Sequence, residues 1–168
     1  LLIKDPRVNE MNKISSPTEF VDIFPTLCDM TNLDMPQNLD GISLKPQIEG
    51  ENNTSKIFAV SQYPRRFKAS GEIMGYSFRS ERYRYTVWVK NKKSTEPISN
   101  DDIYAEELYD YKTDPNETEN KASLENYQRI KTQFVKLANG FFNSQISEKP
   151  TVVKSNVISQ NIMTNDRS

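Results

Sequence analysis

Apolar and polar positions alternate along the chain in patterns that predict helices at both ends and strands between them. The clearest pattern lies near the C-terminus, where apolar residues recur at helical spacing: Leu124, Tyr127, Ile130, Phe134, Leu137 and Phe141. Residues at this spacing share one face of an α-helix, so the stretch predicts a long amphipathic helix. Ser123 is its predicted N-cap, and Lys131 and Lys136 lie off the apolar stripe.

The middle of the chain has the two-residue alternation and aromatic content of strands. The four predicted strands are "KIFAVSQ" (56–62), "GYSFRS" (75–80), "RYRYTVWV" (82–89) and "AEELYDY" (105–111). The second and third are predicted to form a hairpin that turns at residues 80–82. Alternation places Tyr83, Tyr85 and Val87 on one face, and Arg82, Arg84, Thr86 and Trp88 on the other. We therefore predict an α+β fold, with a small four-stranded antiparallel sheet and the long helix on one face.

The first fifty residues predict a different kind of structure. "LLI" at residues 1–3 has the character of the end of a buried strand, whose neighbours would lie outside this chain. The stretch 22–32 predicts a helix with Asp22 as N-cap, Asn32 at its C-terminus and Pro25 in its first turn. Its apolar stripe is formed by Ile23, Leu27 and Met30, with Phe24 beside them. A second short helix over 43–50 ends at Gly50, and we interpret the chain as the C-terminal piece of a longer protein.

Composition excludes several classes of partner and of chemistry. The 168 residues include 22 Lys and Arg, 23 Asp and Glu, one cysteine and no histidine. Charge near zero without a basic arm argues against nucleic acid, and no apolar run approaches the roughly 20 residues that span a bilayer. Without histidine, Cys28 has no partner base and is predicted to be a buried structural thiol. No glycine-rich phosphate loop is present.

Two groups of charged residues remain as candidates for binding. The acidic pairs Asp101–Asp102 and Glu106–Glu107 could hold a hard cation, although a solvated surface is the favoured interpretation. "SQYPR" (61–65) is followed by further cations, and arginine suits bidentate capture of a carboxylate or sulfate. The basic cluster of this region comprises Arg65, Arg66 and Lys68, and Tyr63 could stack on a sugar ring. From these residues alone an ordinary charged loop is favoured over a recognition loop.

Several separate motifs, taken together, resemble one known family. They are "VDIFPTLCDMTNLDMPQNLDGISLKP", "AVSQYPR", "IMGYSFRSERYRYTVWV" and "AEELYDYKTDPNETEN". In this order, across about residues 1–143, they resemble the C-terminal region of type I, formylglycine-dependent sulfatases of the iduronate-2-sulfatase-like branch. The resemblance implies an alkaline-phosphatase-like fold. Residues 1–50 would be the last strand and helix of a large N-terminal α/β domain, residues 51–145 the C-terminal subdomain, and residues 146–168 a disordered polar tail.

The resemblance also implies a function for the complete protein. It would hydrolyse sulfate esters of sulfated uronic acids or polysaccharides, with a calcium ion and a formylglycine, in a secreted, periplasmic or lysosomal location. This chain lacks the C/S-x-P/A-x-R motif that yields formylglycine, so we expect it to contain no catalytic residue, to bind neither cofactor and to be inactive alone.

Gln62, Tyr63 and Arg65 resemble residues at a substrate cleft and are the predicted sugar contacts. The predicted partners are a sulfated carbohydrate and the N-terminal sulfatase domain of the same protein. The alternative is a stand-alone module that binds carbohydrate or a partner without catalysis.

Overall fold

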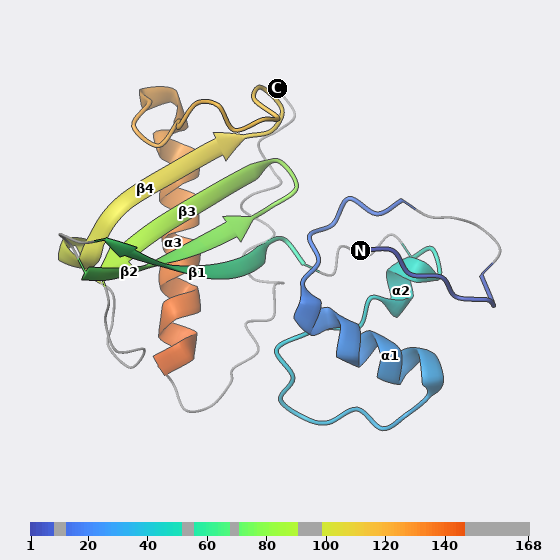
Figure 1. Ribbon diagram of the computed structural model, residues 1–168. Helices are drawn as coiled ribbons and strands as arrows, with labels where there is room; N and C mark the ends of the chain where they lie inside the picture. The colour runs from blue at the N-terminus through green and yellow to red at the C-terminus, as the bar shows by residue number, and fades with distance from the viewer. Residues whose placement is uncertain (9–12, 52–55, 68–70, 91–98, 147–168) are drawn as a thin grey trace.

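The structure, a computed structural model, describes residues 1–8, 13–51, 56–67, 71–90 and 99–146. Figure 1 shows two short helices set apart from a sheet that lies against one long helix. The helices and strands in chain order are α1 (Ile23–Thr31), α2 (Lys45–Ile48), β1 (Ala59–Phe67), β2 (Gly71–Arg79), β3 (Tyr83–Lys90), β4 (Ile103–Asp110) and α3 (Gln128–Ile146). Single turns of 3-10 helix occupy Phe20–Asp22, Asn100–Asp102 and Glu125–Tyr127.

The sheet has four strands in the order β1-β2-β3-β4, and each strand is antiparallel to its neighbours. The predicted hairpin is confirmed, because Arg79 pairs with Arg84 and the backbone N–H of Ser80 donates to the Tyr83 carbonyl at 2.8 Å. The register between β3 and β4 shifts once, between Trp88 and Val89. The predicted α+β architecture is therefore the observed one.

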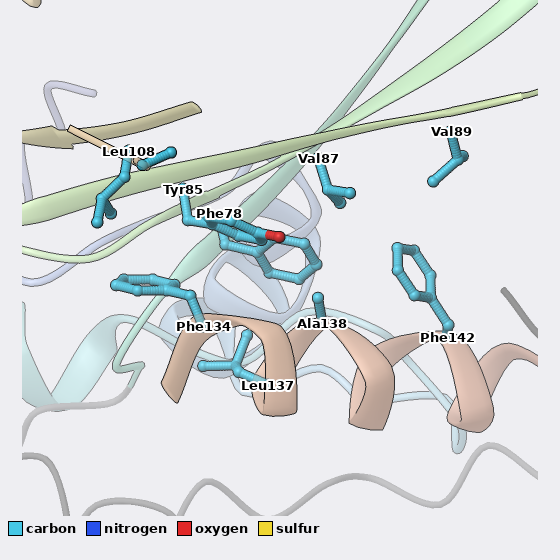
Figure 2. Close-up of a cluster of buried hydrophobic side chains, with 10 residues drawn as sticks. Phe78, Tyr85, Val87, Val89, Leu108, Phe134, Leu137, Ala138 and Phe142 are labelled. Carbon is cyan, nitrogen blue, oxygen red and sulfur yellow. The ribbon is translucent and has the colours of Figure 1, made fainter. Parts of the chain in front are cut away.

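The hydrophobic core lies between α3 and one face of the sheet (Figure 2). Its buried members are Phe78, Tyr85, Val87, Val89, Leu108, Ala122, Phe134, Leu137, Ala138 and Phe142. The Phe134 ring stacks on Tyr85 with 5.9 Å between centroids, and the Phe142 ring meets Tyr76 edge-on at 4.8 Å. The predicted helical stripe is confirmed at its centre. Its start differs, because α3 begins at Gln128 and Ser123 precedes the 3-10 turn rather than capping the helix.

A polar contact crosses the edge of this core. The Tyr85 hydroxyl donates to Glu106 Oε1 at 2.6 Å, and Lys131 Nζ pairs with Glu106 Oε2 at 2.6 Å. Burial raises the pKa of Tyr85, and the neighbouring Glu106 raises it further, so the hydroxyl stays a neutral donor. Lys131 lies off the predicted stripe, and its ion pair with Glu106 links α3 to β4.

Both outer edges of the sheet carry partners from elsewhere in the chain. At β4, the side chain of Asn120 accepts from the Leu108 backbone N–H and donates to the Glu106 carbonyl, each at 3.0 Å. At β1, the Val60 N–H donates to Glu19 Oε1 at 2.8 Å. Strand alternation turns position 64 toward this same edge, where Pro64 has no N–H to offer. These contacts and the proline reduce the number of donors that could pair with another strand.

The region before β1 is organised by the buried carboxylate of Asp22. Asp22 occupies the predicted N-cap position of α1, but its side chain makes no capping bond there. It accepts instead from the backbone N–H groups of Glu19 and Ile42, at 2.8 and 3.0 Å, and pairs with Lys56 Nζ at 2.6 Å. Lys56 also pairs with Glu19, so this cluster connects the helical region to the chain that enters β1.

The burial of α1 differs from the predicted stripe. Its buried side chains are Pro25, Thr26 and Cys28, and Thr26 Oγ1 accepts from the Leu44 N–H at 2.9 Å. Cys28 is a free buried thiol, as predicted, and Asn32 ends the helix in a left-handed conformation with φ 54°. In contrast, Phe24 and Leu27 are 52% and 53% exposed. A helix face is buried only where a neighbour covers it, and here the covered face is the one that carries Pro25, Thr26 and Cys28.

The predicted strand at residues 1–3 is not present in the described structure. Leu1 and Leu2 are 72% and 90% exposed, and this segment has no strand assignment. A strand needs a partner for its backbone N–H and C=O groups, and the sheet offers none at this position. The predicted tail lies outside the described residues from residue 147 onward.

Candidate functional site

The segment "SQYPR" lies inside β1 and is not a loop as predicted. The strand runs from Ala59 to Phe67, and each of residues 61–65 has a register partner on β2. Pro64 is tolerated because β1 is an edge strand and has a neighbour on one side only. The predicted loop is wrong because a proline ends a central strand but not an edge strand.

Strand alternation separates the three predicted contact residues. Gln62 pairs with Tyr76, whose ring packs into the core, so Gln62 belongs to the face that α3 covers. Tyr63 and Arg65 pair with Gly75 and Ile73 and belong to the opposite face, here called the outer face. All three side chains are exposed. The structure therefore brings Tyr63 and Arg65 together and places Gln62 on the other side of the strand.

The outer face has the indole ring of Trp88 near its centre. A Cβ atom added to Gly75 would lie 2.6 Å from Trp88 Cζ3 and 2.8 Å from Cε3, so the ring lies directly against the Gly75 backbone. Trp88 Nε1–H donates to Glu107 Oε1 at 2.7 Å, and the Tyr109 hydroxyl donates to Glu107 Oε2 at 3.0 Å. The ring is thus fixed by packing on Gly75 and by a hydrogen bond at its edge.

Arg65 lies over this ring. Its guanidinium carbon is 4.3 Å from the Trp88 ring centroid and 5.9 Å from that of Tyr63, distances at which a cation is attracted to an aromatic face. Tyr63 itself is 63% exposed. Within the part of the chain that the structure describes, the Arg65 side chain makes no hydrogen bond and no ion pair. A guanidinium that contacts only aromatic rings, with no acceptor among the described residues, keeps its N–H donors for an external acceptor.

The other arginines of the strands and the hairpin turn have partners within the chain. Arg66 pairs with Glu72, Arg82 with Asp110 and Arg84 with Glu117. Arg79 donates to the carbonyls of Ser80 and Glu81, and its guanidinium carbon lies 3.7 Å from the Tyr111 ring centroid. These four arginines therefore have acceptors within the chain.

Three of the four acidic side chains accept hydrogen bonds within the chain, whereas Asp101 is exposed, as the favoured interpretation predicts. Glu106 and Glu107 lie on opposite faces of β4, where they accept from Tyr85 and Trp88 respectively. Asp102 accepts from the Ser99 backbone and hydroxyl. Among the described residues, no group of three or more His, Cys, Asp or Glu side chains could hold a metal ion. Lys68 lies outside the described residues.

None of the helices in the described ranges combines the length and the apolar character needed to cross a bilayer.

Comparison with known proteins gives one family match and several relatives. Residues 1–141 match the family described as "N-sulphoglucosamine sulphohydrolase, C-terminal". The Delta 4,5-hexuronate-2-O-sulfatase of Bacteroides thetaiotaomicron is 32% identical over 118 residues, which are 70% of this chain and 21% of that protein. Iduronate 2-sulfatase of Mus musculus is 31% identical over 128 residues, covering 58% of this chain and 23% of that protein.

A solved structure has the same fold as well as a related sequence. It is described as a putative sulfatase from Bacteroides thetaiotaomicron, with a TM-score of 0.58 and 30% identity over 74% of this chain and 24% of its own. The chain therefore spans less than a quarter of the length of each of these three proteins.

Proposed function

Because the chain belongs to the C-terminal family of N-sulphoglucosamine sulphohydrolase, which its residues 1–141 match, we propose that it is part of a sulfatase acting on sulfated uronic acids. The observation that carries the substrate class is Arg65, a guanidinium over Trp88 with no acceptor among the described residues. An uronic acid has a carboxylate that such a group binds through two parallel hydrogen bonds. Two relatives are named as sulfatases of hexuronate and iduronate, which supports the same class and the iduronate-2-sulfatase-like branch.

The proposal includes a domain organisation for the complete protein. Residues 1–50 belong to the larger catalytic part, residues 51–145 form the C-terminal subdomain, and residues 146–168 form a tail. Calcium and formylglycine, which the sequence resemblance implies, are placed in the larger part. This placement is supported by the lack of a metal-ligand cluster among the described residues and of the formylglycine motif in the sequence. The proposed location remains secreted, periplasmic or lysosomal.

Tyr63 and Arg65 are the proposed substrate contacts in this chain. Both come from one face of one edge strand, so a sugar stacked near Tyr63 would have its carboxylate within reach of the neighbouring guanidinium. Gln62 stays a prediction without this support, because it lies on the face that α3 covers.

We expect Arg65→Ala to weaken hydrolysis of a 2-O-sulfated uronate by the complete protein. Loss of a charged hydrogen bond costs about 1.5–3 kcal/mol, or roughly ten- to a hundredfold in kcat/KM. A small aryl sulfate has no carboxylate, so its kcat/KM is expected to change less than about twofold on the same grounds. Sulfate release from both substrates, measured for the wild type and the variant, checks this prediction.

Arg66→Ala is the matched control for this experiment. Arg66 is the next residue of the strand, faces the other side, is exposed and pairs with Glu72. Its loss is expected to leave both substrates unaffected. Equal losses on both substrates in Arg65→Ala, with a lower melting temperature, would show that Arg65 supports the fold instead. If the complete wild-type protein releases no sulfate from any ester, the sulfatase proposal itself is wrong.

We also propose that the apolar side of α1 docks onto the larger part of the same protein. Most exposed large apolar side chains of the described residues lie between Leu1 and Met35, and Phe20 is 89% exposed. Phe24 and Leu27 lie on the adjacent turn and are each about half exposed, and contiguous surface of this kind is rare on a free monomer. More than three quarters of the length of the compared relatives lies outside the matched region, which supplies the proposed occupant.

A double substitution, Phe24→Glu with Leu27→Glu, is expected to have opposite effects in two settings. In the 168-residue chain it should reduce self-association, because it removes exposed apolar surface, as sedimentation velocity would measure. In the complete protein it should lower the melting temperature, because two charges would be buried at the docking surface. The control is Lys136→Glu with Asn139→Glu, two exposed positions of α3. If the double variant has no effect in the complete protein, the α1 face is not the docking surface.

A further inference from the structure

We infer that Trp88 is a positioning residue, which holds the Arg65 guanidinium in place for an acidic group of the substrate. This inference rests on the proposed role of Arg65 in substrate binding. The structure places Trp88 between the Gly75 backbone, where an added Cβ would clash with the ring, and a cation that has no acceptor among the described residues.

The Trp88 ring is held in one position on the outer face of the sheet. A side chain at position 75 would overlap three of its ring atoms, all within 2.6–2.9 Å of the added Cβ. The Nε1–H group is held by Glu107, and Glu107 is itself held by the Tyr109 hydroxyl. The residue is only 8% exposed. With one ring face on Gly75 and the edge on Glu107, the remaining ring face is the one that Arg65 covers.

This arrangement addresses a general cost of using arginine for recognition. The side chain has many rotamers, and ordering them when a ligand binds reduces affinity. A guanidinium that already lies over an aromatic ring is partly ordered before the ligand arrives. A cation–π contact uses no hydrogen-bond acceptor, so the N–H groups remain available for a carboxylate, and these are the donors that bidentate pairing requires. The Trp88 ring therefore orders the Arg65 side chain without occupying its N–H donors.

The neighbouring arginines differ from Arg65 in what orders their side chains. Arg66 and Arg84 are each ordered by a carboxylate, which occupies their donors. Arg65 is ordered by aromatic rings alone within the described residues. An arginine ordered by a carboxylate of its own protein would exclude a second carboxylate, whereas one ordered by a ring can accept it.

The experiment compares Trp88→Leu, Trp88→Phe, Arg65→Ala and the double variant Trp88→Leu/Arg65→Ala in the complete protein. For a 2-O-sulfated uronate, Trp88→Leu is expected to lower kcat/KM roughly three- to thirtyfold, mainly through a higher KM. Trp88→Phe keeps an aromatic face and should retain most of the activity. Trp88→Leu/Arg65→Ala should be no worse than Arg65→Ala, because both changes remove one interaction. For an aryl sulfate, which has no carboxylate, each of these variants should lose less kcat/KM than it loses for the uronate.

Gly75→Ala provides an independent second variant. The added methyl group must displace the ring, so the same rise in KM on the uronate is expected while Trp88 and Arg65 are both still present. Melting temperatures of all variants accompany the kinetics.

Four outcomes would overturn the inference. Equal losses on both substrates in Trp88→Phe, with a lower melting temperature, would make Trp88 structural only. Independent, multiplying losses in Trp88→Leu/Arg65→Ala would show that Trp88 does not act through Arg65. A uronate KM that is unchanged in Trp88→Leu but raised in Arg65→Ala would remove Trp88 and leave the proposed function intact. If Arg65→Ala itself has no selective effect, the proposed substrate contact fails and the inference fails with it.

Discussion

Leu137→Asp and Phe134→Asp are each expected to abolish the cooperative unfolding transition of the sheet and α3. Leu137 and Phe134 are 4% and 8% exposed, and both face the sheet from the middle of the helix (Figure 2). Aspartate at either position would bury a charge without a partner and remove apolar contacts, at a cost of several kcal/mol. That is a large part of the roughly 5–15 kcal/mol that stabilises an ordinary domain. Far-UV circular dichroism during urea unfolding measures the effect.

The matched control is Lys136→Asp, on the exposed side of the same helix. Its expected cost is about 0.5 kcal/mol or less, as for most surface substitutions. Lys131 would be a poor control, although the sequence pattern also puts it off the apolar stripe. It pairs with Glu106, which also accepts from Tyr85, so its loss would disturb a half-buried contact. Similar destabilisation by Lys136→Asp and Leu137→Asp would show that the buried face of α3 is wrongly assigned.

The sequence predicts the sheet and α3 well because their apolar faces are covered by one another. Tyr85 and Val87 on β3 meet Phe134 and Phe142 on α3, so the period of each element and its burial agree. The same logic fails for α1. Its apolar residues Phe24 and Leu27 follow the helical period, yet the parts of this chain that could cover them pack on the other side. A periodic pattern indicates which face is buried in the complete protein, and not which partner lies in a given chain.

The candidate site shows a second limit of sequence reasoning. The proline and arginines of "SQYPR" indicated a loop, because sequence cannot distinguish an edge strand from a strand end. The alternation that separates Gln62 from Tyr63 and Arg65 becomes certain only when the register with β2 is known. Alternation correctly places Trp88 on the same face as Thr86, but it does not show what lies over the ring. Its partner Gly75 lies thirteen positions away, and Arg65 reaches it across β2, so no local pattern connects them.

Asp110→Ala is expected to destabilise the sheet–helix unit by roughly 3 kcal/mol or more, because it leaves a paired arginine without its partner. Asp110 ends β4 and is fully buried. Its carboxylate accepts from Arg82 Nε at 3.0 Å, from the Lys112 backbone N–H at 3.1 Å and from the Tyr127 hydroxyl at 3.1 Å. One side chain thus joins the hairpin turn, the turn after β4 and the approach to α3. Asp101→Ala, at an exposed position, is the control in urea unfolding and should cost little.

The pH dependence of this stabilisation follows from the direction of the Asp110 pKa shift. Desolvation by burial raises the pKa, but the bonds from Arg82, Lys112 and Tyr127 outweigh it, so the folded pKa lies below the ordinary value. A lowered folded pKa stabilises the native state above the unfolded pKa of about 3.9 and ceases to do so as pH falls through the folded value. The difference in unfolding free energy between wild type and Asp110→Asn should therefore be constant near neutral pH and should shrink below about pH 4. A difference that stays constant down to about pH 2 would show that the ionised carboxylate contributes nothing and that only its shape matters.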